Sequence, residues 1–506
     1  MNKFRNILIL CLLVFSQTLL RAQTYERIYR NNFWNGTDNV TGVRQDSLSS
    51  SFAEIYGLYE GGGFKDTWEA EEGWSAGAAT ASIRHLERLS LAGSFSFSQT
   101  EGYGMCGSMF IRPGFYPVDV MEFTPGRKTL QQYGFDGGIS YDIAPRWRIG
   151  AEMEFESANL SKRKDLRHTN WRLDMEVAPG FMFHDGDFAA GAAAIFVKTS
   201  ESVDAEQVGT SESSYYAFLD KGLMYGTYSV WTGNGLHLDE LGLTSFPVRE
   251  FSYGGSLQLQ YKGLFADLKY LRSYGSVGEK EYIWFSFPGN TFRVNLAYRL
   301  RPSDGAHGDH FFRLSYLLKD RTMSESVLEK VASNGVTTVY NHGWNRIYAD
   351  AEWSVTPEYE YVSERWESRV YAELSGKTAV SSQIYPYIYI RSLMSWQAHA
   401  EFILHGIGRF DLGFKVGYGG ASCTEADRLA TEDSGVQTSP FRLQEWYDMQ
   451  MDYIEADRIH AGISARYRIY KGIYAEIGGN LTRGFGFESR NGAYRYGAAL
   501  KIGYQF

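Results

Sequence analysis

Long apolar runs and an excess of positive charge are both missing from most of this 506-residue sequence. After residue 22, no uninterrupted stretch of about 18 apolar residues occurs, so no transmembrane helix is expected. The 59 Asp and Glu outnumber the 50 Lys and Arg, and the resulting net charge of −9 disfavours nucleic acid as a partner. No repeat of about 40 residues is evident, which argues against a propeller.

The N-terminus has the three parts of a secretory signal peptide. Lys3 and Arg5 form a short basic region, residues 7–15 are apolar, and Ala22 ends a plausible cleavage site before Gln23. We therefore expect residues 1–22 to be removed on export. Because this segment is basic, the mature chain would be more acidic than the whole sequence.

Only two cysteines, Cys106 and Cys423, lie outside the expected signal peptide. Both fall in long polar segments, and an exported protein meets an oxidising compartment. A disulfide between two loops is one interpretation. Two unpaired thiols are the other, because the spacing matches no known framework.

The last thirteen residues alternate between two kinds of side chain and end on an aromatic residue. In an extended strand, successive side chains point to opposite sides. One face therefore carries Tyr494, Tyr496, Ala498, Leu500, Ile502, Tyr504 and Phe506. The other face carries Arg495, Gly497, Ala499, Lys501, Gly503 and Gln505. A strand with one apolar and one polar face suits the wall of a barrel in a lipid bilayer.

The same alternation recurs from residue 51 onward, for example over 147–156, 346–355, 409–418 and 458–469. Each segment can cross an outer membrane, which takes about 9 to 11 tilted residues. Counting such segments predicts about 18 strands, with 16 as the alternative. A soluble sandwich is disfavoured, since its strands usually run only about 5 to 6 residues.

The connections between these segments alternate in length. Short turns, such as those at 143–146 and 470–472, follow the even-numbered strands. Long polar segments follow many odd-numbered strands, and we expect loops at 100–128, 201–249 and 420–453. Short turns on one side and long loops on the other are typical of outer-membrane barrels. This pattern places both termini on the periplasmic side.

The terminal strand resembles that of Gram-negative outer-membrane β-barrel proteins, whose assembly machinery recognises a final aromatic residue such as Phe506. The resemblance implies an all-β fold, a single transmembrane antiparallel up-and-down β-barrel over residues 51–506, in contact with outer-membrane lipid. It also implies an uncharacterised family of envelope barrels, porin-like or transporter-like, encoded near TonB-dependent uptake systems. The chain differs from TonB-dependent receptors themselves because no globular plug of the usual size precedes the barrel. No cofactor is implied.

Residues 23–50 lack sustained alternation. They are expected to form a periplasmic lead-in, a segment inside the lumen, or a mobile terminus.

Charged residues on the polar face are the candidates for lining the lumen. An acidic set on strands five and six would face basic sets on strands ten, eleven and sixteen and create a transverse field in an open pore. The alternative is that the charges pair along the wall of a closed interior. The candidates are Glu152, Glu154, Glu156, Asp174, Glu176, Arg293, Arg299, Arg313, Lys319, Arg346, Asp350, Glu352, Arg458, Arg466 and Arg468.

Aromatic residues concentrate in the longest expected loop, as they do at many binding surfaces. These loop candidates are Tyr215, Tyr216, Phe218, Tyr225, Tyr228 and Trp231. Aromatic packing within the loop or an interfacial girdle would give the same pattern.

No local motif indicates catalysis or a metal site. Ser375-Gly376-Lys377-Thr378 lacks the first glycine of a phosphate-binding loop, and His307 and His310 lie in an expected turn without distant partners. We therefore expect a channel or transporter for small polar solutes, not an enzyme. The alternatives are a receptor or accessory subunit that binds through its loops, and a long-chain lipid transporter.

Overall fold

The computed structural model describes residues 25–46, 48–206, 215–231, 245–279, 282–302, 308–333, 336–383, 386, 388–426, 443–486 and 493–506. None of the helices in these ranges is both long and apolar enough to span a membrane.

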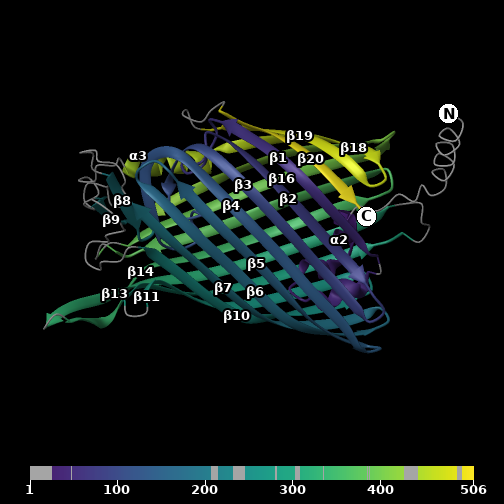
Figure 1. The fold of residues 1–506 in the computed structure, drawn as a ribbon, viewed down its shortest axis with the longest axis horizontal. Helices are drawn as coiled ribbons and strands as arrows, with labels where there is room; N and C mark the ends of the chain where they lie inside the picture. The colour runs from purple at the N-terminus through teal and green to yellow at the C-terminus, as the bar shows by residue number, and fades with distance from the viewer. Residues whose placement is uncertain are drawn as a thin grey trace, which may run out of the picture.

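Within the described ranges, eighteen antiparallel strands form a closed barrel (Figure 1). Neighbours in sequence pair with one another, β7 pairs with β10, and the last strand pairs with the first. The expected β-barrel of about 18 strands is confirmed. The strands are β1 (Ser50–Gly62), β2 (Glu72–His85), β3 (Leu89–Ser108), β4 (Asp119–Ala144), β5 (Trp147–Lys162), β6 (Arg167–Asp185), β7 (Phe188–Glu206), β10 (Phe246–Tyr261), β11 (Leu264–Glu279), β12 (Tyr282–Leu300), β13 (Asp309–Ser333), β14 (Val336–Val362), β15 (Trp366–Ser381), β16 (Tyr389–Ile407), β17 (Phe410–Ala426), β18 (Asp457–Tyr470), β19 (Ile473–Phe485) and β20 (Tyr494–Gln505).

The barrel turns its apolar face outward. On β20, the side chains of Tyr494, Tyr496, Leu500 and Ile502 are all exposed, as the alternation predicts. Polar residues on the other face, such as Lys501, lie inside near Glu54 of β1. An apolar exterior around a polar interior is the arrangement of a protein that spans an outer membrane.

Several strands are longer than the alternation predicts. Residues 100–128, expected to be a loop, belong mostly to β3 and β4, and only 109–118 lie between them. Period-two hydrophobicity fades in these extensions, where the consecutive residues Val120 and Met121 are both buried and Glu101 pairs with Arg127. Hydrogen bonding between neighbouring strands does not need that pattern, so the ladder persists without it.

Residues 25–46 lie inside the barrel and are called the N-terminal insert below. They form α2 (Tyr25–Asn31) and two short 3₁₀ helices, η1 (Phe33–Gly36) and η2 (Val40–Gln45). The side chains of Asn32 and Asn39 accept hydrogen bonds from the backbone N of Trp34 and Thr41 and so cap the two 3₁₀ helices.

Glycines of the wall make room for this insert. A Cβ added at Gly138 would lie 2.5 Å from Cγ2 of Val40, and one at Gly180 would lie 2.6 Å from Oδ1 of Asn39. Because real Cβ atoms do not approach so closely, these inward-facing positions cannot carry a side chain while the insert is in place.

At the end of the barrel opposite α2, where Figure 1 shows α3, β8 and β9, three segments pack together and form what is called the cap below. They are residues 109–118, the hairpin of β8 (Tyr215–Asp220) and β9 (Gly226–Trp231), and α3 (Leu443–Glu455). Met109 and Phe110 pack in one buried cluster with Leu219 of β8 and with residues of β10–β16. Leu443 of α3 packs against Phe218 and Met121. The expected loops at 201–249 and 420–453 therefore contain folded elements that reach over the lumen.

Candidate functional site

A cavity of about 540 Å³ lies inside the barrel between the N-terminal insert and the wall. Tyr25, Tyr29 and Trp34 of the insert line one side, and Asp136 and Glu152 of β4 and β5 line the other. A volume of this size suits a small molecule. The cavity combines aromatic rings with carboxylates, so it can present both apolar contact and negative charge to a solute.

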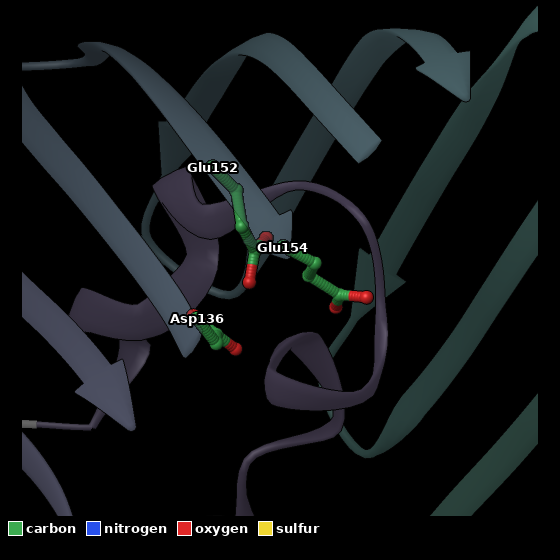
Figure 2. Close-up of side chains that lie close together, drawn as sticks. All are labelled: Asp136, Glu152 and Glu154. Atoms are coloured by element: carbon green, nitrogen blue, oxygen red, sulfur yellow. The ribbon is translucent and has the colours of Figure 1, made fainter. Parts of the chain in front are cut away.

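Three carboxylates meet at this wall. Ligand oxygens of Asp136, Glu152 and Glu154 all lie within 4.8 Å of one another. In Figure 2 the side chains project from β4 and β5 into the space beside the coils of the N-terminal insert. Oε2 of Glu152 is buried and has no hydrogen-bond partner among the described residues. Oxygen ligands at this spacing suit a divalent cation or an ammonium group, and their mutual repulsion favours a positive neighbour.

Ion pairs fix the N-terminal insert to the wall at separate points. Arg30 Nη1 lies 2.7 Å from Oε1 of Glu360, and Arg30 Nη2 lies 3.2 Å from Oε2 of Glu367. Asp38 lies 2.7 Å from Nζ of Lys269. Burial opposes ionisation of Asp38, but the charge of Lys269, hydrogen bonds with Glu176 and Lys269 and the charge of Arg293 together outweigh it and lower the pKa of Asp38.

Apolar side chains of the insert also pack against the inner wall. Trp34 is almost fully buried and packs with Phe265 at a ring-centroid distance of 5.5 Å. Its Nε1 donates a hydrogen bond to Oε1 of Gln260. Val40 and Val43 pack against Ile83 of β2. The insert is thus held to the wall by buried apolar side chains together with hydrogen bonds and ion pairs.

The predicted acidic set lies on the inner wall, and most of its members have basic partners. Glu156 and Asp174 both contact Arg112, at 2.5 and 3.7 Å. Glu176 lies 3.6 Å from Nζ of Lys269. Glu152 and Glu154 belong to the carboxylate group described above.

The predicted basic set is paired in a similar way. Arg313 contacts Glu358 at 2.6 Å and Glu360 at 2.7 Å. Arg466 pairs with Glu476 at 2.7 Å. Arg299 pairs with Asp309, and Arg468 pairs with Asp411. Arg293 lies opposite Lys269 in the strand register, and Lys319 lies over the ring of Phe115.

Asp350 and Glu352 of β14 lie among cations. Asp350 is buried and contacts Arg321 at 3.0 Å and Lys377 at 3.7 Å. Glu352 lies opposite Lys319 and Lys377 in the register of the flanking strands. The lumen is therefore not the open charged pore that was one of the two expectations. Its charges pair along the wall, and the insert and the cap lie within it.

Two residues expected to line the lumen do not do so in the way predicted. The register of β13 and β14 shifts between Met323 and Ser324, and Ile347 at that shift is buried in the cap cluster. Strict alternation therefore fails there, and Arg346 is exposed. Arg458 instead donates hydrogen bonds to the carbonyls of Tyr453 and Ile454 near the end of α3.

The loop aromatics do not form an exposed surface where they are described. Phe218 and Tyr225 are buried in the cap, at 1% and 8% exposure. The side chains of Tyr215, Tyr216, Tyr228 and Trp231 lie outside the described part of the chain. Phe218 packs against Met121 and Leu443, and Tyr225 packs against the ring of Tyr389, so both described rings are held by contacts with other elements of the cap and the wall.

Cys106 and Cys423 are both free thiols. They lie on β3 and β17, so the interpretation as two unpaired cysteines is the one that holds in this structure.

Some functional candidates were missed in the sequence. Asp136 and Lys269 lie on the polar faces of β4 and β11, and the alternation that identified Glu152 could have found them. Arg30 and Asp38 lie before the first strand, where no periodic pattern marks a side chain as facing the lumen.

The model of a protein family matches residues 41–506. The chain belongs to the family of unknown function DUF6850. No curated protein matches the sequence.

Solved structures similar to the chain include outer-membrane barrels. One is BauA, the ferric preacinetobactin receptor from Acinetobacter baumannii, with 8% identity, a TM-score of 0.39, and coverage of 90% of this chain and 80% of that chain. Another is the outer membrane protein opdK from Pseudomonas aeruginosa, with 8% identity, a TM-score of 0.34, and coverage of 91% and 99%. With such low identities and TM-scores, these likenesses say nothing about what this member of the family binds.

Proposed function

We propose that this protein is a gated, non-catalytic outer-membrane transporter for small polar solutes, in which the N-terminal insert is the periplasmic gate. The observation that carries the proposal is the cavity between the insert and the wall, with Asp136 and Glu152 on one side and the N-terminal insert on the other. A segment held by side chains, with no strand pairing to the barrel, can leave without breaking the sheet.

The contacts of the insert fit a gate. Arg30, Asp38 and Trp34 bind the wall through ion pairs and a hydrogen bond that water can replace. Glu360 retains Arg313 as a partner when Arg30 leaves, so opening does not leave the buried carboxylate of Glu360 without a counter-charge. The buried side chains of Trp34, Val40 and Val43 favour the closed position, and opening exposes them to water.

A reversible cross-link tests whether the insert must move. Cβ of Val40 would lie 3.2 Å from a Cβ at Gly138, close to the usual Cβ separation of about 3.5–4.5 Å in a disulfide. The double variant Val40→Cys with Gly138→Cys, made after Cys106 and Cys423 are changed to Ala, joins η2 to β4. We expect oxidation to abolish solute flux into liposomes and a reductant to restore it.

The matched control joins two positions that do not move relative to each other. A Cβ at Gly134 would lie 3.9 Å from Cβ of Ser96 on the neighbouring strand, so Ser96→Cys with Gly134→Cys forms a bond within the wall. Its oxidation should leave flux unchanged. Equal flux through the oxidised and reduced forms of the insert cross-link would show that the insert is not a gate.

A further inference from the structure

The outer face of the barrel carries a groove of about 570 Å³ over β7. Ala190 and Ala192 form its floor, Phe181 and Phe183 of β6 stand on one side, and Leu257 of β10 stands on the other. The groove reaches the main chain of Gly191 and Gln258, whose neighbours in the lumen are Trp34 and Asn39.

The strand register explains the shape of the groove. Ala190 lies between Phe183 and Leu259, and Ala192 lies between Phe181 and Leu257. Each alanine is therefore flanked on both sides by a large side chain that points into the lipid. The result is a trough that runs along β7, open to the hydrocarbon and without a charged residue on its described lining.

The periplasmic mouth of the groove carries two cations and two carboxylates. Arg146 directly precedes Trp147, which lines the groove, and contacts Asp185 at 3.4 Å with both side chains largely exposed. Lys262 follows Tyr261 and lies 5.4 Å from its ring. The backbone N of Lys262 donates to the carbonyl of Asp187, so the two turns adjoin.

We propose that this groove holds one acyl chain of a glycerophospholipid from the periplasmic leaflet whose head group is phosphoethanolamine. Arg146 and Lys262 face the phosphate, and Asp185 and Asp187 face the primary amine. The apolar trough suits the acyl chain of the lipid. The charges of both signs at its mouth match a zwitterionic head group. A purely anionic head group has no cation to pair with the two carboxylates, which would repel it.

The test measures lipid bound to the full protein purified from outer membranes in a mild detergent. Native mass spectrometry of delipidated protein, titrated with phosphatidylethanolamine, phosphatidylglycerol or phosphatidylcholine, gives the occupancy of each. We expect phosphatidylethanolamine to bind most, and Ala192→Trp, which fills the trough, to lower its occupancy about fivefold or more, equivalent to about 1 kcal/mol. Ala192→Leu provides a smaller filling change if the Trp variant does not fold.

Two matched controls are available on the same barrel. Ala461 of β18 faces the lipid between Val416 and Leu481, so Ala461→Trp adds the same bulk elsewhere. Lys471 lies 5.9 Å from the ring of Tyr470 in another periplasmic turn, as Lys262 does with Tyr261. We expect Lys262→Gln to weaken binding of phosphatidylethanolamine, and Lys471→Gln to leave it unchanged.

Three results would overturn the proposal. The first is unchanged occupancy in folded Ala192→Trp or Ala192→Leu protein. The second is equal binding of phosphatidylethanolamine and phosphatidylglycerol by the wild type. The third is a dimer that Ala192→Trp dissociates, because it would make a second copy of the chain the occupant of the groove.

Discussion

Arg30 of the N-terminal insert and Glu360 of β14 form an ion pair inside the lumen, with Nη1 of Arg30 2.7 Å from Oε1 of Glu360. The carboxylate is almost fully buried, whereas the guanidinium is about one-third exposed. Glu360 also contacts Arg313, and Arg30 also contacts Glu367. The pair therefore joins the N-terminal insert to a charge network in which Glu360 keeps Arg313 as a partner.

Arg30→Gln should favour the open state of the proposed gate. Loss of a partly exposed ion pair costs about 0.5–1 kcal/mol, which corresponds to about a two- to fivefold rise in the open population. Single-channel recording in planar bilayers measures that population directly. Arg30→Lys retains the charge and should lie closer to the wild type.

The control for this prediction is an ion pair elsewhere in the lumen. Arg495 Nη2 lies 3.3 Å from Oε2 of Glu60, and neither residue belongs to the insert. Arg495→Gln should leave the open population unchanged. An identical effect of both substitutions would indicate general loosening of the barrel instead of release of the insert.

The barrel itself could be predicted from the sequence because one physical rule governs each of its strands. Because lipid lies outside and water or polar groups lie inside, apolar and polar side chains alternate along each strand. The alternation of Tyr494–Phe506 therefore recurs in eighteen segments. The rule fails where its cause is missing. The ends of β3 and β4 that face the cap continue without alternation, since the consecutive residues Val120 and Met121 are both buried, and at the register shift near Ile347 the alternation reverses.

The candidate site was only half predictable for the same reason. Glu152 follows the alternation, so its place on the inner wall could be read directly. Its neighbours Tyr25 and Tyr29 belong to a segment without periodicity, and their position depends on contacts such as Trp34 with Phe265 that join residues far apart in sequence. Likewise, Phe218 has the composition of a binding loop but packs against Leu443, which lies in a different loop.

The carboxylates at Asp136, Glu152 and Glu154 should set the charge preference of the open transporter. Replacing all three by their amides, Asp136→Asn with Glu152→Gln and Glu154→Gln, removes negative charge while keeping shape. In the Arg30→Gln background, we expect preference for cations over anions to fall, as measured by reversal potential in a salt gradient.

Glu373 provides a comparison for that experiment. It lies on the inner wall at β15 and accepts a hydrogen bond from Gln397 at 2.9 Å, away from the insert. Glu373→Gln should change the reversal potential less than the triple variant does. A reversal potential unaffected by the triple variant would mean that ions do not pass the cavity.

The stability of the cap should fall as pH rises. Burial raises the pKa of Asp220 in β8 to about 6, against the opposing effect of hydrogen bonds from the backbone N of Gly222 and Met224. The folded cap thus binds the proton more tightly than an unfolded chain, whose Asp has a pKa of about 3.9. The contribution of Asp220 is greatest below pH 4 and decreases until about pH 6, and burial of Asp119, which raises its pKa to about 8, extends the decrease to higher pH.

Hydrogen exchange of residues 215–225 between pH 4 and 7, corrected for intrinsic exchange, checks this expectation. Asp220→Asn retains an oxygen that can accept from Gly222 and Met224 but cannot ionise, so its protection should depend less on pH than that of the wild type. Asp119 lies opposite Asp220 in the strand register, and Asp119→Asn tests whether that neighbour causes any remaining dependence. Constant protection in the wild type would contradict the prediction.

Removal of Phe506 should impair insertion into the outer membrane. Its backbone N donates to the carbonyl of Ser51 and its carbonyl accepts from the N of Ser51, both at 2.9 Å, so this residue completes the seam between the last and first strands. Its ring, which stacks on Tyr504 at 5.2 Å, is exposed, as the expected recognition by assembly machinery requires. The folded, heat-modifiable fraction in outer-membrane preparations measures insertion, and Phe506→Tyr, which keeps the ring, should insert normally.

Refolding of both purified variants into lipid vesicles separates the two roles of Phe506. Equal refolding with unequal insertion in cells indicates recognition of the terminus. Equal insertion in cells would remove any role for the terminal aromatic residue.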